Sequence, residues 1–284
     1  MIPKRIFFCW GGDKLSWMRY MTFYSFRRYN PDWEIILYRL ENNRGNKWNG
    51  REKQDIWEYN GIDYFSKLAE LNINVVEVKL DDSSFSQISP IHKSDLFRYY
   101  VLFNLGGIYC DTDVIFFRSF ENYYKQIISN SINTIIHEYF ARDNAYHLTI
   151  GMLGSSVNNE YYKDLFDFGM KNICDDYYQS MGVMLIYKML NMRACTSVAD
   201  IIYSKYKNLK FFNLPTNLIY KYDWTMIDKC FKIGYNISDF DQESVGYHWY
   251  GGSPLVQEFN NVLNENTYQN YTTTFCNIVK HVLY

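Results

Sequence analysis

The sequence lacks three features that would each point to a particular class of protein. Its 6 cysteines form no Cys-x-x-Cys pair and no dense cluster with histidine, so a zinc site is not indicated. The longest nearly apolar stretch, 181–187, is far too short to span a bilayer, and the apolar run 6–10 is too short for a secretory signal. We therefore expect a cytoplasmic protein with mostly free, buried thiols.

The chain also lacks an excess of charge of either sign. Lys and Arg number 29 against 31 Asp and Glu, a net charge of -2, which argues against a general nucleic-acid binder but not against a local basic patch. With 48% hydrophobic and 21% charged residues, a disordered chain is excluded. No repeat or low-complexity linker divides the 284 residues, so we expect a single domain over 1–284 that can bury a large core.

Aromatic residues are abundant: 28 Tyr, 20 Phe and 7 Trp make up 19% of the chain. Aromatic faces bind the apolar faces of sugars and stack on bases, and tyrosine adds a polar tip. An AT-rich genome, which favours Tyr, Phe, Asn and Ile codons, would produce the same bias. Composition alone therefore leaves both explanations open.

The first half of the chain alternates strand and helix signals, which is typical of a layered α/β fold. Ser89 and Pro90 suit the N-cap and first turn of a helix that Gly106 and Gly107 close. The expected strands are 2–9, 33–38, 74–80, 108–110, 114–117, 132–138, 148–153 and 209–214. The expected helices are 16–29, 51–71, 89–105, 158–170 and 179–190, with loops at 41–50 and 81–87.

The strongest functional signal is the segment 106–113, Gly-Gly-Ile-Tyr-Cys-Asp-Thr-Asp. Asp111 and Asp113 follow a buried strand and a Gly-Gly turn. Carboxylate oxygens suit Mg²⁺ or Mn²⁺ held together with substrate phosphates, and such an ion neutralises a diphosphate leaving group. Asp-x-Asp alone is common on surface loops, but this context favours a functional site.

Three further segments carry candidate site residues. Asp95 and Arg98 share one face of a helix that is apolar almost all round, which indicates that the helix is buried and that the two charges belong to a site. The alternative is that they form an ordinary ion pair at the surface. Trp10 ends the first strand, where it either stacks on a nucleobase or packs in the core. The segment 246–253, with His248 and Trp249 between glycines, is either a mobile lid with stacking groups or a surface hairpin.

Taken together and in order, these segments resemble the Asp-x-Asp sugar transferases of glycosyltransferase family 32, of the bacterial capsular-polysaccharide type. The sugar-transferring domain of the large clostridial toxins is a more distant relative. The start, 2–12, is similar to the family's opening IPKxIHxxWxGG, although Phe7 replaces the histidine. The segment 94–113 is similar to its SDxxRxxxLxxxGGxYxDxD. Two later family turns are altered here, at 148–151 and at 180–183, which puts donor choice and acceptor positioning in doubt.

The resemblance implies a GT-A fold, a Rossmann-like nucleotide-sugar-binding sheet flanked by helices. Residues 1–120 would form the donor and metal half, and 121–284 the acceptor half with a C-terminal lid. The implied catalytic residues are Asp95, Arg98, Asp111 and Asp113, and the implied metal ligands are Asp111, Asp113 and His248. The implied donor-binding residues are Phe8, Cys9, Trp10, Tyr109, Asp111, Thr112, His248, Trp249 and Ser253.

The implied activity is a retaining transfer of a sugar, with Mn²⁺ or Mg²⁺, in capsule or surface polysaccharide synthesis. The donor would be a UDP-sugar or, second, a GDP-sugar, and the acceptor a glycan or lipid-linked oligosaccharide, with no nucleic-acid partner. A lipid-linked acceptor would allow peripheral attachment at the inner face of the membrane. Glu138 and Asp143 follow a strand and are candidate nucleophiles, but we favour front-face attack with the leaving phosphate as base.

Two other functions fit parts of the sequence. A haloacid-dehalogenase-type phosphatase would use Asp111 as nucleophile and the acidic pair Asp175 and Asp176 for its metal, but it leaves 94–98 unexplained. A non-catalytic carbohydrate-binding protein would explain the aromatic residues and would bind glycans without metal or nucleotide.

Overall fold

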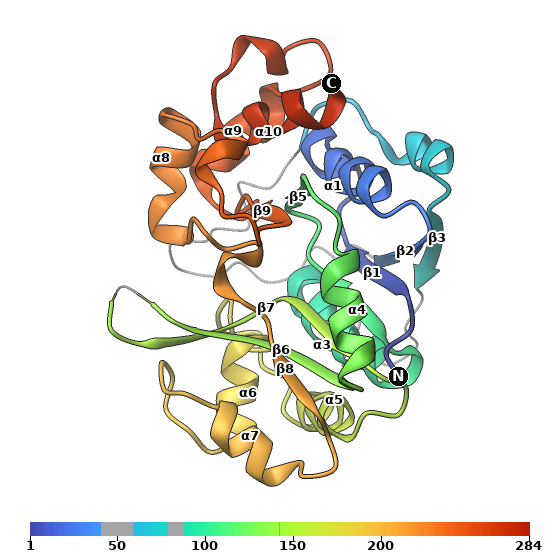
Figure 1. The fold of residues 1–284 in the computed structure, drawn as a ribbon, viewed down its shortest axis with the longest axis vertical. Helices are drawn as coiled ribbons and strands as arrows, with labels where there is room; N and C mark the ends of the chain where they lie inside the picture. Colours follow the sequence, from blue (N-terminus) through green and yellow to red (C-terminus); the bar gives the residue numbers. More distant parts are fainter. Residues whose placement is uncertain (41–58, 79–87, 142) are drawn as a thin grey trace.

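The computed structural model describes residues 1–40, 59–78, 88–141 and 143–284. Its centre is a seven-stranded sheet in the order β3-β2-β1-β4-β7-β6-β8, in which β7 alone runs antiparallel to its neighbours (Figure 1). The strands are β1 (Arg5–Trp10), β2 (Glu34–Leu40), β3 (Asn74–Val78), β4 (Gly107–Cys110), β6 (Thr134–Phe140), β7 (Tyr146–Ser155) and β8 (Phe211–Asn213).

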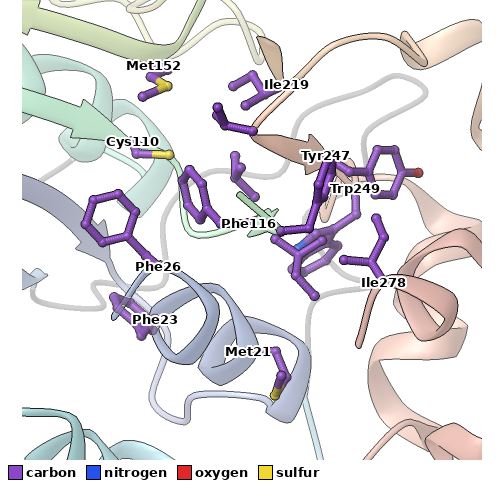
Figure 2. Packing of buried hydrophobic residues seen from close by; sticks show 14 of the residues in the cluster. Met21, Phe23, Phe26, Cys110, Phe116, Met152, Ile219, Tyr247, Trp249 and Ile278 are labelled. Carbon is purple, nitrogen blue, oxygen red and sulfur yellow. The ribbon is translucent and has the colours of Figure 1, made fainter. Parts of the chain in front are cut away.

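Two hydrophobic cores cover the two faces of this sheet. Side chains alternate along a strand, so β1 sends Ile6 and Phe8 into the first core and Phe7 and Cys9 into the second. The first core lies under α1 (Trp17–Tyr29) and α10 (Thr274–Leu283), and Figure 2 shows part of it. The second lies under α3 (Pro90–Leu105), α5 (Glu160–Lys171) and α6 (Val183–Met189).

Short elements complete the described chain. The remaining α-helices are α4 (Glu121–Ser129), α7 (Ala199–Lys205), α8 (Ile227–Lys232) and α9 (Pro254–Val262). The 3-10 helices are η2 (Phe65–Leu71), η3 (Thr216–Leu218), η4 (Trp224–Met226), η5 (Ile237–Asp239) and η6 (Tyr268–Asn270). In Figure 1, α9 and α10 lie beside α1 at one end of the view, and α5, α6 and α7 lie at the opposite end.

A second, two-stranded sheet joins the C-terminal third of the chain to the centre. Strand β5 (Val114–Phe116) pairs antiparallel with β9 (Gly246–His248), and Val114 lies opposite His248. Two main-chain hydrogen bonds flank the pair, from Trp249 N to Asp113 O at 2.8 Å and from Phe117 N to Val245 O at 2.9 Å. The segment after residue 245 is thereby held against the residues that follow β4.

The predicted α/β class, a sheet flanked by helices, is confirmed, and every predicted strand is present with shifted ends. Helix α1 begins after Ser16, whose hydroxyl accepts from Arg19 N, and α3 begins after Ser89, whose hydroxyl accepts from His92 N. Gly106 closes α3 with a φ of 63°, a conformation that glycine adopts without strain.

Three predictions differ from the structure or fall outside it. Of the helix expected at 51–71, residues 51–58 lie outside the described part, 59–64 are not helical, and only the 3-10 helix η2 remains. The helix expected at 179–190 starts at Val183, because 179–182 form a turn closed by Gly182 N donating to Gln179 O. The loops expected at 41–50 and 81–87 lie outside the described residues. Among the described helices, none combines the length and the apolar character needed to cross a bilayer.

Candidate functional site

The candidate site lies where the strand order of the sheet reverses. From β1 the chain builds outward to β2 and β3, and it then returns to place β4 on the other side of β1. In such sheets ligands bind beyond the carboxyl ends of the strands at this switch point. A cavity of about 1390 Å³ opens there, and both Trp10, which ends β1, and Asp111, which follows β4, line it.

Asp111, Asp113 and His248 meet at the floor of this cavity. Each offers one ligand atom, and these atoms lie within 4.8 Å of one another. His248 Nε2 lies 3.2 Å from Asp113 Oδ1, and the main-chain N–H of Gly251 donates to Asp113 Oδ2 at 2.8 Å. The β5–β9 pairing is what brings His248, distant in sequence, beside the two aspartates.

The three side chains perturb each other's protonation. Burial, with the neighbouring Asp113 charge, raises the pKa of Asp111. Burial also disfavours ionised Asp113, but the adjacent His248 and its hydrogen bond prevail and hold the pKa of Asp113 well below its ordinary value. Burial likewise opposes protonated His248, yet the Asp113 carboxylate raises the pKa of His248 above its ordinary value. The metal-free site therefore favours a positive charge between the carboxylates.

This donor set fits a divalent cation. Carboxylate oxygens are the ligands that Mg²⁺ and Mn²⁺ prefer, and a neutral imidazole nitrogen is a common metal ligand. A cation would take the place of the imidazolium charge beside Asp113. Asp111, Asp113 and His248 are therefore the residues that could hold a metal.

Asp95 and Arg98 form a buried pair that reaches into the same site. Asp95 Oδ1 accepts from Arg98 Nη2 at 2.7 Å, and both side chains are almost fully buried, at 6% and 5% exposed. Arg98 Nη1 also donates to Ile150 O at 2.7 Å and lies 3.3 Å from Asp111 Oδ1. Burial raises the pKa of Asp95 to about 6. The alternative of a surface ion pair is thus excluded.

Tyr109 connects this pair to the metal candidate. Its ring lies 4.4 Å from the Arg98 guanidinium, and its hydroxyl donates to Asp111 Oδ1 at 2.9 Å. Ser94 Oγ lies 3.1 Å from the same hydroxyl. The segment 94–98 and the Asp-x-Asp segment therefore form one continuous network.

Trp10 lies at the wall of the cavity and is partly exposed. Its Nε1 donates to Lys14 O at 3.0 Å, which fixes the plane of the indole ring. The guanidinium of Arg19 lies 4.0 Å from the ring centroid. Arg19 was not among the predicted site residues, because in the sequence it is one polar residue within an apolar helix.

Two predicted donor-binding residues do not line the cavity. Phe8 points into the first core and packs on Phe23 at 4.8 Å between ring centroids, because neighbouring residues of β1 face opposite sides. Trp249 is fully buried and packs on Phe275, since it follows His248 and faces the opposite side. The other predicted site residues that line the cavity are Cys9, Tyr109, Thr112, His248 and Ser253.

The segment 246–253 is neither a surface hairpin nor, in its first half, a mobile lid. Gly246 to His248 form the buried strand β9, and only the turn after it reaches the cavity surface. Residues that the sequence analysis did not assign complete the wall: Tyr139, Tyr178, Gln179, Tyr220, Trp224 and Tyr250. Tyr250 belongs to the segment 246–253 that the sequence singled out, whereas for Tyr139, Tyr178, Tyr220 and Trp224 the aromatic composition was the sequence signal.

The candidate nucleophiles Glu138 and Asp143 do not line the cavity. Glu138 accepts from Ser197 Oγ and from Val198 N at the start of α7, and Asp143 pairs with His147 at 2.8 Å. The acidic pair required by the phosphatase alternative is also elsewhere, because Asp175 contacts His92, and Asp176 accepts from Cys174. Neither Asp175 nor Asp176 is in the cavity wall with Asp111.

Comparison with known proteins agrees with this geometry. The model of the family described as "Glycosyltransferase sugar-binding region containing DXD motif" matches residues 16–140. That range holds both the Asp95–Arg98 pair and the Asp-x-Asp segment. A search of curated protein sequences finds no match at the required level of similarity.

Several solved structures are similar at low identity. The glycosyltransferase GlyE of Streptococcus pneumoniae TIGR4, in its apo form, is 13% identical with a TM-score of 0.47, over 98% of this chain and 64% of GlyE. Mouse xyloside xylosyltransferase 1 is 7% identical, TM-score 0.45, over 89% of this chain and 100% of the enzyme. The PaToxG glycosyltransferase is 18% identical, TM-score 0.43, over 73% and 71%.

This chain thus spans less than two thirds of GlyE, and TM-scores this low carry no weight for its function. The family match covers less than half of the chain, and it includes Asp95, Arg98, Asp111 and Asp113 but not Trp10 or His248. Over residues 16–140 the chain is therefore similar to the DXD-containing sugar-binding region of glycosyltransferases.

Proposed function

We propose that this chain is a GT-A-type, metal-dependent glycosyltransferase that moves a sugar from a nucleotide-sugar, a UDP-sugar first, to a glycan or lipid-linked acceptor in surface polysaccharide synthesis. The observation that carries the proposal is the convergence of Asp111, Asp113 and His248 beside the buried Asp95–Arg98 pair in one cavity. Carboxylates alone would repel a diphosphate, so this arrangement suits a diphosphate only when a cation lies between them.

The chemistry that the site must support is charge separation. As the glycosyl bond breaks, the anomeric carbon becomes oxocarbenium-like and the nucleoside diphosphate gains charge. Asp111, Asp113 and His248 would hold Mn²⁺ or Mg²⁺, and the ion supplies Lewis-acid stabilisation of the leaving group. Arg98, fixed by Asp95 and by the Ile150 carbonyl, adds a preorganised positive charge where the negative charge develops.

The described cavity wall supports retention by front-face attack. Its carboxylates are Asp13, Asp95, Asp111 and Asp113. Asp95 is paired with Arg98, and Asp111 and Asp113 belong to the metal candidate. With Glu138 and Asp143 outside the wall, Asp13 is the carboxylate that a covalent glycosyl-enzyme intermediate would have to use among the described wall residues, and we favour the front-face route over it. The leaving phosphate would then accept the proton of the acceptor hydroxyl.

A donor screen tests this proposal. Purified protein is incubated with a panel of UDP- and GDP-sugars in Mn²⁺, and release of the nucleoside diphosphate is measured alongside hydrolysis of an aryl phosphate. We expect hydrolysis of one UDP-sugar that stops in EDTA and in Asp113→Asn protein. Aryl-phosphate hydrolysis without sugar-nucleotide turnover, or turnover that survives EDTA, would contradict it.

A further inference from the structure

Arg19 is a buried cation whose position the chemistry proposed above does not use. It is on α1, on the face of the sheet opposite α3, and is 5% exposed. Its guanidinium carbon lies 4.0 Å from the centroid of Trp10 and 5.3 Å from that of Trp249. The exposed remainder of the side chain lines the cavity. The two indoles therefore fix the guanidinium at the cavity wall.

The polar contacts of Arg19 are few for a buried guanidinium. Nη1 donates to Thr112 Oγ1 at 2.5 Å, the residue between the two aspartates of the Asp-x-Asp segment. Among the residues that the structure describes, no carboxylate oxygen lies within 4.0 Å of its side-chain nitrogens. Arginine carries five N–H donors, and this hydrogen bond uses one of them.

The charges around Arg19 indicate what kind of ligand its guanidinium could bind. Burying a cation without an adjacent anion is costly, and among the charges that favour the charged guanidinium those of Asp113 and Asp111 are the largest. A divalent cation on these two aspartates would neutralise that charge. A ligand anion at the cavity wall beside Arg19 would restore the balance.

We propose that Arg19 binds the phosphates of the donor nucleotide, on the other side of the Asp-x-Asp segment from Arg98. The inference rests on the proposed function. Arg98 reaches the segment from α3 through Asp111, and Arg19 reaches it from α1 through Thr112. The planar guanidinium can hold two phosphate oxygens at once, which a lysine ammonium cannot do with the same geometry. Because Arg19 covers one face of the Trp10 indole, a base that stacks on Trp10 would have to use the other face.

The experiment compares ligands that differ only in phosphate. Binding of UDP, UMP and uridine, each with Mn²⁺, is measured by calorimetry for wild type and for Arg19→Met, Arg19→Lys and Arg28→Met. Arg28 is an exposed arginine on the same helix and serves as the matched control. We expect Arg19→Met to weaken UDP binding by roughly 10- to 100-fold and uridine binding little, with Arg19→Lys intermediate and Arg28→Met unchanged.

Two other results for the Arg19 variants would overturn the inference. Equal losses for UDP and uridine would show that Arg19 only supports Trp10, and unchanged UDP binding would show that Arg19 is structural; either overturns the inference. If Arg19→Met does not fold, UDP and uridine are compared on Arg19→Lys: a selective loss of UDP binding supports the phosphate contact, and an equal loss or no loss overturns it.

A second probe separates this inference from the proposed function. Inorganic pyrophosphate with Mn²⁺ carries the phosphates without a nucleoside. If wild type binds no UDP or GDP but binds Mn²⁺-pyrophosphate in a way that Arg19→Met weakens, the nucleotide-sugar function fails and the phosphate role of Arg19 stands. If UDP binds, and Arg19→Met changes neither the affinity for UDP nor that for Mn²⁺-pyrophosphate, the inference fails and the proposed function stands.

Discussion

The imidazole of His248 on β9 lies 3.2 Å from the carboxylate of Asp113, which immediately precedes β5. The two residues are far apart in sequence, and only the ladder between β5 and β9 brings them together. The same carboxylate accepts the Gly251 N–H, so Asp113 is held from two directions before any ligand binds. The protein therefore preorganises this carboxylate of the candidate metal site.

Mn²⁺-dependent binding of UDP should require the carboxylate of Asp113. Asp113→Ala removes a presumed direct ligand, and Asp113→Asn keeps its shape but loses its charge. We expect both to lower Mn²⁺-dependent UDP binding and turnover by orders of magnitude, with high Mn²⁺ partly rescuing the asparagine variant. Asp228→Asn, at an exposed surface ion pair, is the control. Normal Mn²⁺ dependence in Asp113→Ala protein, measured by calorimetry, would remove Asp113 from the metal site.

His248 should make metal affinity pH-dependent. Its pKa is raised in the metal-free protein above the ordinary 6.5, and a metal needs the neutral imidazole. Mn²⁺ affinity should therefore rise with pH through the His248 titration, and His248→Gln should flatten that rise. An unchanged slope in this variant would assign the titration to another group.

The same shift predicts how the metal-free protein responds to pH. Because the folded pKa of His248 is raised, its contribution to the free energy of unfolding is fully present below about 6.5. The contribution is lost as the pH rises through the folded value. In EDTA, the difference in stability between wild type and His248→Gln should therefore shrink toward alkaline pH. A difference that grows instead would contradict the protonated state inferred for His248.

Arg98 should be needed both for turnover and for the fold. Arg98→Lys keeps the charge but loses the fork that contacts Asp95 and Ile150, so turnover should fall at least 100-fold, about 3 kcal/mol of transition-state stabilisation. Arg98→Met leaves Asp95 buried without its partner and should cost about 3–5 kcal/mol in the free energy of unfolding. Lys163→Met, in an exposed pair with Asp167, should cost less than about 1 kcal/mol. Full activity of Arg98→Lys protein in the donor assay would make Arg98 a structural residue.

Trp10 should contribute through the base rather than the phosphates. Trp10→Ala removes one stacking surface and should weaken UDP and uridine binding equally, about 10- to 100-fold, or about 1–3 kcal/mol. Trp10→Phe should recover part of the loss. Fluorescence titration of both ligands checks this. Unchanged uridine affinity would mean that the indole serves only to hold Arg19.

Gly151 allows the chain to pass close to the metal candidate. A Cβ at this position would lie 2.8 Å from Asp111 Oδ2 and would also collide with the Tyr220 hydroxyl. Gly151→Ala should therefore displace Asp111 and lower Mn²⁺ affinity about 10-fold, and adding Tyr220→Phe should restore part of it by opening space. Calorimetry with Mn²⁺ alone measures both. If Gly151→Ala binds Mn²⁺ normally, Asp111 tolerates the shift or does not ligate.

Sequence reasoning reached the parts of the fold whose signals are local. The alternation of β1, the Ser89-Pro90 start of α3 and the Gly106 turn each depend on neighbouring residues, and each is present. Strand β9 was missed because it has only three residues, the first of them Gly246, and is defined by its pairing with the distant strand β5. Helix α10 was missed although its one buried face has helical spacing.

In the candidate site, too, the residues predicted from the sequence are those that lie in local motifs. Asp95, Arg98, Asp111 and Asp113 were predicted from two adjacent motifs, and the structure places all four at one cavity. Arg19 was not predicted, because its contacts with Trp10, Trp249 and Thr112 join three separate segments. The error at Phe8 has a simple cause: the motif is a string of adjacent letters, but adjacent residues of a strand face opposite sides.

The pairing of β5 with β9 also has a consequence for how the protein is made. Every described strand of the large sheet has been synthesised once residue 213 is added, but His248 and Gly251 have not. A chain that ends between these points would carry the Asp-x-Asp segment without the imidazole and the N–H that hold Asp113. We therefore expect chains that end before residue 248 to bind a divalent cation poorly.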